Sequence, residues 1–262
     1  MDECLPTLIH FYDREFSLRM LKVFDGNLVV RQRLETDPTG YVIRNLWIES
    51  RNAKDDVHLW VFDNPTGNSL RRKLYPEYKL TRKPPNDDIR QFMELWKSVV
   101  KLTPALSITV PGYEADDVIA HVAAQFPCEI ISRDADLRQL EMYPGVKVKT
   151  DSLKSIPPEL IRLYKASVGD PSDNIKGIPG FGKATFENCD KDALRNFYQG
   201  GQVPTDLPQR CQNALAADPE HYRMIWKIVT FFPIPNELVD SNLVQGKDMP
   251  DKVEAILKEL LM

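Results

Sequence analysis

The chain has 262 residues, a formal net charge of −4 and ordinary apolar and charged fractions, which fits a globular protein of one large or two small domains. No apolar run approaches the length of a membrane span, and the acidic start Met1-Asp2-Glu3 excludes a typical signal peptide, so a cytoplasmic protein is expected. Four dispersed cysteines form no CxxC pair, which excludes a local zinc knuckle and suits a reducing compartment.

Segments with strand composition alternate with helical patterns along the first 170 residues. The expected strands are Leu21–Phe24, Val57–Phe62, Leu106–Val110, Cys128–Ser132 and an edge-like Val146–Lys149. The expected helices are Leu8–Phe16, Gly40–Ala53, Ile89–Val100 with Asn86 as its N-cap, and Pro157–Val168. This alternation predicts an α/β fold with a mostly parallel central sheet flanked by helices.

Acidic residues follow four of the expected strands. They are Asp25, Asp63, the group Glu114, Asp116 and Asp117, and the pair Asp134 and Asp136. Because parallel strands place their carboxyl ends at one edge of a sheet, these acids are expected to converge there. The structural alternative is that Glu114–Asp117 merely caps a helix, where acidic residues are electrostatically favoured.

Two further carboxylates, Asp170 and Asp173, begin the glycine-punctuated stretch that runs to Thr185. Either one is also a plausible helix N-cap. Nine carboxylates in one place repel one another unless cations lie between them. Oxygen ligands without His or Cys indicate Mg²⁺ or Mn²⁺, and two such ions roughly 4 Å apart are the usual arrangement for phosphodiester hydrolysis. Carboxylates loaded with metal present no negative surface, so the net charge of −4 does not exclude a nucleic-acid partner.

The most basic stretch, Ser69–Lys83, contains Tyr75 and Tyr78 among its cations. Basic residues around aromatics suit phosphate contacts and base stacking, although a solvated basic loop is an equal alternative. Within it, Lys79 and Arg82 are expected to place positive charge on the reacting phosphate. Beyond Thr185 the pattern is helical, over Ala193–Tyr198, Leu207–Ala216, Tyr222–Phe232 and Val253–Leu261.

Five sets of residues carry a family resemblance. They are Val23–Asn27; Val61–Asp63 with Leu74–Arg82; Gly112–Asp117; Ser132–Leu137; and Gly169–Ile175 with Gly177–Gly182. Together they resemble the 5′-nuclease (flap endonuclease) superfamily, in particular stand-alone phage and bacterial 5′→3′ exonucleases and the N-terminal nuclease domain of bacterial DNA polymerase I. The resemblance spans roughly Leu21 to Thr185.

The resemblance implies a PIN-like α/β nuclease domain over residues 1–165, with a helical arch at about 83–104. It implies a helical subdomain over 166–262, with a helix–three-turn–helix motif at Gly177–Thr185 that grips duplex phosphates and holds a K⁺ ion. One Mg²⁺ or Mn²⁺ ion would bind Asp25, Asp63, Glu114, Asp116 and Asp134, and a second would bind Asp117, Asp136, Asp170 and Asp173.

The resemblance also implies roles for the remaining site residues. The implied catalytic residues are Asp25, Asp63, Lys79, Arg82, Asp116 and Asp134. The implied DNA contacts are Arg71, Tyr78, Lys79, Arg82, Gly177, Ile178, Gly180, Gly182 and Lys183, with Tyr78 stacked on the base beside the scissile phosphate.

The implied activity is 5′→3′ exonucleolytic and 5′-flap endonucleolytic cleavage, with removal of RNA primers. DNA and RNA/DNA hybrids would be the substrates of a monomer, with a single-strand-binding protein as a further partner. A PIN-type ribonuclease is the enzymatic alternative, against which the helix–three-turn–helix signature speaks. A non-catalytic DNA-junction-binding protein is the other alternative, which the complete set of acids disfavours.

Overall fold

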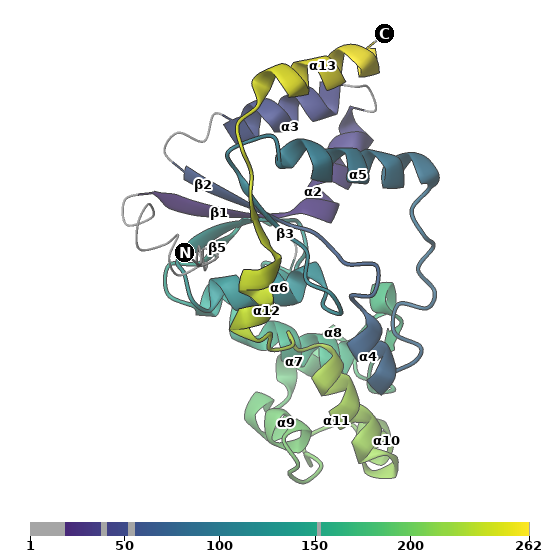
Figure 1. Ribbon diagram of the computed structural model, residues 1–262. Coiled ribbons are helices and arrows are strands. Elements are labelled where there is room, and N and C mark those ends of the chain that lie inside the picture. Colours follow the sequence, from purple (N-terminus) through teal and green to yellow (C-terminus); the bar gives the residue numbers. More distant parts are fainter. Residues whose placement is uncertain (1–18, 38–40, 52–55, 151–152, 262) are drawn as a thin grey trace. The chain divides into compact units, whose positions relative to one another are not determined.

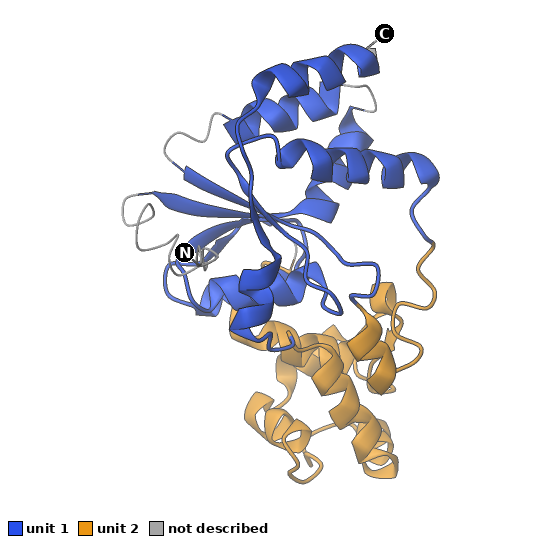
Figure 2. Ribbon diagram, viewed as in Figure 1, with its two compact units in different colours: residues 1–67, 84–152, 232–262 blue, residues 68–83, 153–231 orange. Residues whose placement is uncertain are grey.

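The computed structural model describes residues 19–37, 41–51, 56–150 and 153–261, so the helix expected at Leu8–Phe16 lies outside the described residues. The chain divides into two compact units (Figure 2). Unit 1 comprises Met1–Gly67, Pro84–Ser152 and Phe232–Met262, and unit 2 comprises Asn68–Lys83 and Leu153–Phe231.

Unit 1 is built on a six-stranded sheet with the order β5-β4-β1-β2-β3-β8. Its strands are β1 (Met20–Asp25), β2 (Asp56–Val61), β3 (Leu106–Ile108), β4 (Cys128–Ile131), β5 (Lys147–Val148) and β8 (Leu243–Gln245). All neighbours pair in parallel except β8, which runs antiparallel to β3. The mostly parallel sheet is therefore confirmed, as is the position of β5 at an edge.

Helices cover both faces of this sheet (Figure 1). They are α2 (Gly26–Thr36), α3 (Tyr41–Arg51), α5 (Asp87–Val100), α6 (Ala115–Ala123), α12 (Asn236–Asn242) and α13 (Pro250–Leu261), together with the 3₁₀ helix η2 (Asp136–Met142). Buried side chains of α2, α3, α5 and α13 form one apolar cluster with residues of β1 and β2. Helices α6 and α12 lie on the opposite face of the sheet.

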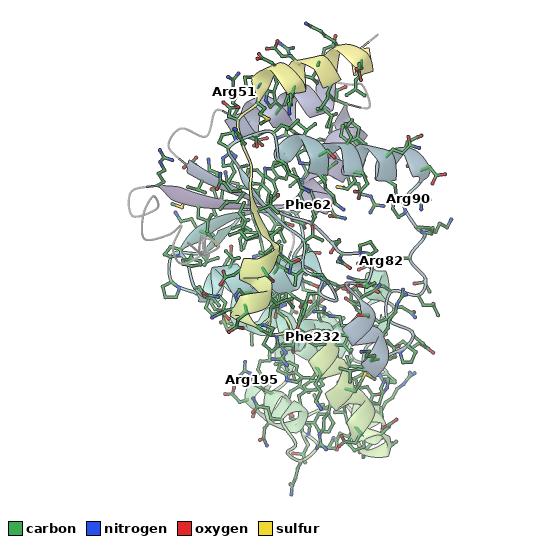
Figure 3. The ribbon with its side chains drawn as sticks, viewed as in Figure 1. Arg51, Phe62, Arg82, Arg90, Arg195 and Phe232 are labelled. Carbon is green, nitrogen blue, oxygen red and sulfur yellow. The ribbon has the colours of Figure 1, made fainter. Side chains whose placement is uncertain are left out.

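Aromatic rings fill the core between the sheet and α5. Phe24 and Trp60 stack with ring centroids 4.4 Å apart, and Trp60 and Trp96 make a T-shaped contact with centroids 5.0 Å apart. Phe62, labelled in Figure 3, continues this row at 6.4 Å from Trp60. Such rings bury large apolar areas, so this cluster anchors the strand ends that precede Asp25 and Asp63.

Helix α5 shows how the sequence fixes an element. The Asn86 side chain accepts a 2.8 Å hydrogen bond from the Ile89 amide, which confirms the expected N-cap. Met93, Trp96 and Val100 are buried at helical spacing in the core of unit 1. Within the range expected as an arch, 83–104, one side of α5 therefore packs into the core of unit 1, and the longest continuously exposed segment here is Leu80–Asp88.

Unit 2 is helical. Its helices are α4 (Ser69–Leu74), α7 (Pro158–Val168), α8 (Lys183–Asn188), α9 (Lys191–Tyr198), α10 (Gln209–Ala217) and α11 (Pro219–Ile228). Between α7 and α8, β6 (Gly169–Asp170) and β7 (Ile175–Lys176) form a small antiparallel hairpin around the 3₁₀ turn η3 (Pro171–Asp173). One apolar cluster that includes Leu163, Phe197 and Ile225 holds the helices together.

The units divide the chain differently from the expected boundary at residues 165 and 166. The last segment, Phe232–Met262, belongs to unit 1, because β8 pairs with β3 and because Val253 and Leu257 of α13 join the core of unit 1. The basic stretch belongs to unit 2, because Tyr75 and Tyr78 are buried in its apolar cluster. None of the described helices is long and apolar enough to span a membrane.

Buried His58 on β2 predicts a pH-dependent stability. Burial, and then the charge of Lys22, lowers the pKa of His58 to about 4, against the opposing effect of Asp56. An unfolded histidine has a pKa of about 6.5, so the unfolded state binds more protons between these values and stability falls as the pH drops through this window. Between pH 7 and pH 5, the free energy of unfolding of wild-type protein in urea should fall by about 2 kcal/mol relative to that of His58→Phe. An equal loss in both proteins would contradict this assignment.

Candidate functional site

The register of the sheet brings three acidic residues to one edge. Asp25 lies opposite Val61 on β2, and Phe24 lies opposite Ile131 on β4. Asp63 therefore follows β2, and Asp134 follows β4, at the edge where β1 ends at Asp25. This is the convergence that the parallel sheet predicts.

Asp25 is the most electrostatically perturbed carboxylate at this edge. It is 6% exposed and accepts hydrogen bonds from the Leu28 amide at 3.2 Å and from the Ser132 hydroxyl at 2.9 Å. Burial, then the charge of Asp63 and more weakly that of Asp134, raises the pKa of Asp25 to about 7, although both hydrogen bonds lower it. A bound cation would reverse this penalty, because it favours the ionised carboxylate.

Asp63 is positioned by two hydrogen bonds, each between a backbone amide and a side-chain oxygen. Its amide donates to the side-chain oxygen of Asn27 at 3.0 Å, and its carboxylate accepts from the Ala115 amide at 2.9 Å. Asp63 thus joins the start of α2 to the start of α6. Gly26 is required beside it, because a Cβ there would lie 2.5 Å from the Phe62 ring and 2.8 Å from the Val61 carbonyl oxygen.

The loop after β4 orders its two acids through Ser132. The Ser132 hydroxyl accepts from the Asp134 amide at 3.0 Å while it donates to Asp25. The Asp134 carboxylate in turn accepts from the Asp136 amide at 2.8 Å. One serine therefore links the ends of β1 and β4.

The three acids at the start of α6 differ in their surroundings. Asp117 is 1% exposed, and its two carboxylate oxygens accept from the Phe232 amide at 2.8 Å and the Glu114 amide at 3.2 Å. These bonds give Asp117 the helix-capping role that the sequence offered as the alternative to metal binding. Glu114, the N-cap of α6, is buried, and Asp116 in the first turn of the same helix is half-buried.

The donor chemistry of this edge fits a hard divalent cation. The seven acids at this edge offer carboxylate oxygens without His or Cys, and burial together with the charge of Asp63 raises the pKa of Asp25. Within the described residues, however, no three His, Cys, Asp or Glu side chains are close enough together to hold an ion as they stand.

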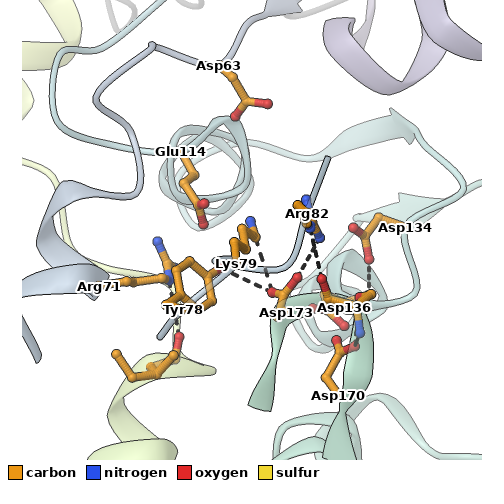
Figure 4. A network of polar contacts seen from close by, with 12 residues as sticks. Asp63, Arg71, Tyr78, Lys79, Arg82, Glu114, Asp134, Asp136, Asp170 and Asp173 are labelled. Carbon is orange, nitrogen blue, oxygen red and sulfur yellow. Dashed lines mark hydrogen bonds and ion pairs between the residues drawn. The ribbon is translucent and has the colours of Figure 1, made fainter. Parts of the chain in front are cut away.

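In unit 2, Asp173 is the centre of a polar network with three residues of the basic stretch (Figure 4). Arg82 approaches one of its oxygens at 2.5 Å, while the Tyr78 hydroxyl donates to the other at 3.1 Å and the Lys79 ammonium lies 4.0 Å from it. The Lys79 amide also donates to the Asp173 carbonyl at 2.9 Å. The carboxylate thus holds the two expected catalytic cations in place.

Asp170 has its own cation. Its carboxylate contacts the Lys165 ammonium at 2.6 Å and accepts from the Ser172 amide at 2.9 Å and hydroxyl at 2.7 Å. Burial alone would raise the pKa of Asp170, but Lys165 and Ser172 together lower it. Asp170 and Asp173 are therefore each paired with a cation of unit 2.

Two of the expected DNA contacts are buried within unit 2. The Arg71 side chain is 4% exposed and donates to the carbonyl oxygens of Ile228 at 3.1 Å and Thr230 at 3.0 Å. Tyr78 is 3% exposed, so its ring is not available to stack on a base in this conformation. Their burial follows from the packing of α4 and α11, which the basic composition of the stretch does not reveal.

The glycine turn between α7 and α8 has a fixed backbone. A Cβ at Gly177 would lie 2.2 Å from the Val168 carbonyl oxygen, and Gly180 has a φ of +84°. Ile178 is buried and its amide donates to the Ser167 carbonyl at 2.8 Å, whereas Gly182 and Lys183 are exposed. The turn between α7 and α8 thus exposes Pro179, Gly180 and Gly182, and its role as a duplex-gripping motif stays a prediction.

Comparison with known proteins places these features in a family. The family model of the 5′-3′ exonuclease N-terminal resolvase-like domain matches residues 22–163. The chain belongs to the 5′-3′ exonuclease family. The 5′-3′ exonuclease of Aquifex aeolicus (strain VF5) is 36% identical over 237 residues, which cover 84% of this chain and 80% of that relative. This confirms the resemblance, and the family consists of hydrolytic enzymes.

Thermostable DNA polymerase I of Thermus thermophilus is 32% identical over 180 residues, or 62% of this chain. The match covers only 22% of that polymerase, so the chain corresponds to a fraction of its length. Solved structures share the fold: phage T5 5′-exonuclease with bound divalent metal (zinc) has a TM-score of 0.64 at 19% identity, covering 93% of this chain and all of that one. The catalytic core of Rad2 with DNA substrate has a TM-score of 0.51 at 15% identity, covering 94% of this chain and 88% of that one.

Three positioning residues of this 5′-3′ exonuclease family member escaped the sequence reasoning. Ser132 and Asn27 lie within the motif segments but are not acidic, so a search for metal ligands passes over them. Lys165 lies on α7, five residues before its partner Asp170. The sequence signal that could have identified Ser132 and Asn27 is a polar residue close to an acid at the end of a strand.

Proposed function

We propose that this chain is a divalent-metal-dependent 5′→3′ exodeoxyribonuclease that also cleaves 5′ flaps and removes RNA primers from RNA/DNA hybrids. The observation that carries the proposal is the acidic edge of unit 1, where Asp25, Asp63 and Asp134 lie at the carboxyl ends of β1, β2 and β4. The chain acts as a monomer, with a single-strand-binding protein as a further partner.

Two Mg²⁺ or Mn²⁺ ions are proposed as cofactors. The first ion would be held by Asp25, Asp63, Glu114, Asp116 and Asp134, and the second by Asp117, Asp136, Asp170 and Asp173. When bound, such ions activate water and stabilise the leaving oxygen of a phosphodiester. The neighbouring T5 5′-exonuclease structures, whose names include metal ions, support divalent metal as the cofactor.

The other residues of the site would orient the metal ligands and bind the DNA. Ser132 orients Asp25 and Asp134, and Asn27 holds the backbone of Asp63. Lys79 and Arg82, kept in place by Asp173, would bring positive charge to the phosphate undergoing attack. The loop Gly177–Gly182 with Ile178 and Lys183 would bind the duplex backbone and a K⁺ ion.

A substrate panel tests this proposal. Purified protein in Mg²⁺ should release the flap near the junction of a 5′-flapped DNA duplex and leave single-stranded RNA uncut. Asp116→Ala and Asp134→Ala should each lower the rate by about 10²-fold or more, whereas Asp251→Ala at an exposed site on α13 should not. Cleavage of single-stranded RNA in preference to the flap would replace the proposal with a PIN-type ribonuclease. Tight flap binding without any product would leave a junction-binding protein.

A further inference from the structure

The start of α10 in unit 2 is packed against the glycine loop. Cys211 is fully buried, and its sulfur lies 3.6 Å from the carbonyl oxygen of Pro179 in that loop. The preceding residue, Arg210, is exposed on the same turn of the helix. Because the buried Cys211 packs against the loop, the neighbouring Arg210 is held beside the loop.

The Arg210 side chain runs alongside Gly180. A Cβ placed at Gly180 would lie 3.1 Å from Cδ and 3.7 Å from Nε of Arg210. The aliphatic stem of the arginine thus covers the glycine, whose φ of +84° turns the chain at this point. Because Arg210 is exposed, its side chain lies at the protein surface next to the loop.

The guanidinium of Arg210 is not engaged elsewhere in the described part of the chain. It makes no hydrogen bond or ion pair there, whereas Arg195 of α9 contacts Asp192 at 2.7 Å and Lys183 lies 3.8 Å from Glu187. Lys176, directly before Gly177, is exposed as well. The loop is therefore flanked by cations, and its most available arginine comes from a helix that follows the loop by some 30 residues.

We propose that Arg210 binds a backbone phosphate of the DNA duplex beside the loop Gly177–Gly182. An arginine fork matches two phosphate oxygens, and a loop with small residues lets a nucleic-acid backbone approach closely. This inference rests on the proposed function and deepens it, because it assigns a duplex contact to α10. A phosphate contact adds affinity without selecting a sequence.

Binding of a nicked DNA duplex, measured by fluorescence anisotropy in EDTA at several salt concentrations, tests the proposal. Arg210→Gln should weaken binding about 3- to 10-fold at moderate salt and reduce the slope of log Kd against log salt by about 0.9. Arg210→Lys should recover most of the slope. Arg44→Gln, at an exposed arginine of α3 that has no ion pair among the described residues, is the matched control and should bind like wild type.

Cleavage kinetics separate this inference from the proposed function. Arg210→Gln should raise KM, leave kcat within about twofold and leave the thermal midpoint unchanged, because the residue is exposed and is not one of the proposed metal ligands. If wild-type protein cleaves a flap but Arg210→Gln keeps the wild-type affinity and salt slope, the proposed role of Arg210 is overturned and the proposed function stands. Wild-type protein that neither binds nor cleaves the duplex would overturn both.

Discussion

Asp25→Asn should abolish metal-dependent cleavage and yet stabilise the metal-free protein. The ionised carboxylate is buried near Asp63 and Asp134, so its charge costs folding free energy without a cation. For an acid whose folded pKa is raised from 3.8 to about 7, stability falls as the pH rises through that window. Asn keeps an acceptor for Leu28 or Ser132 but carries no charge. At pH 8 in EDTA the variant should be more stable by about 1–3 kcal/mol, a shift of several degrees.

Calorimetry with and without Mg²⁺ checks this result. Added Mg²⁺ should raise the unfolding temperature of wild-type protein and leave that of Asp25→Asn almost unchanged, while the cleavage rate falls by about 10²–10³-fold. Asp251→Asn at an exposed position should behave as wild type in both measurements. An Asp25→Asn protein that is less stable in EDTA would show that the acceptor role of Asp25 outweighs its charge.

Asp173→Ala should destabilise unit 2 even where no metal is present. The carboxylate pairs with Arg82 and Lys79 and accepts the buried Tyr78 hydroxyl, and the substitution removes these contacts together. Asp173, Lys79 and Tyr78 are largely buried while Arg82 is half-exposed, so breaking this network should cost roughly 2–4 kcal/mol. Urea unfolding in EDTA should detect this loss, and activity in Mg²⁺ should fall because Lys79 and Arg82 lose their anchor.

The companion variant Tyr78→Phe calibrates the effect. It removes one hydrogen bond and keeps the buried ring, so it should cost about 1 kcal/mol. A protein with Asp173→Ala that unfolds like wild type in EDTA and differs only in Mg²⁺ would assign Asp173 to metal binding alone. The structural anchor and the expected ligand role are thereby distinguished.

The acidic edge of unit 1 was predictable because it depends on local patterns. Short apolar strands ending in Asp25, Asp63 or Asp134 are visible in the sequence, and the parallel sheet brings such ends together. The N-cap at Asn86 and the edge position of β5 follow from equally local signals. Hydrophobic periodicity and the positions of turn and capping residues therefore sufficed to predict most strands and helices of unit 1.

Features that depend on distant packing were not predictable. Arg71 and Tyr78 sit in a basic stretch, yet the carbonyls that bind Arg71 come from the end of α11, 157 positions later. The last helix, α13, joins unit 1 because of its contacts with that core, although it follows the helices of unit 2. Helix α2 and strand β8 carry weak patterns and are settled by tertiary contacts.

The most direct test of the central claim is product analysis on a 5′-labelled DNA duplex with a 5′ flap, in Mg²⁺ and in EDTA. The account predicts that wild-type protein releases the flap near the junction, or short nucleotides from a recessed 5′ end, only with Mg²⁺, and that Asp134→Ala releases neither. Equal cleavage in EDTA, or full activity of Asp134→Ala in Mg²⁺, would contradict a carboxylate-bound metal at the carboxyl edge of the sheet.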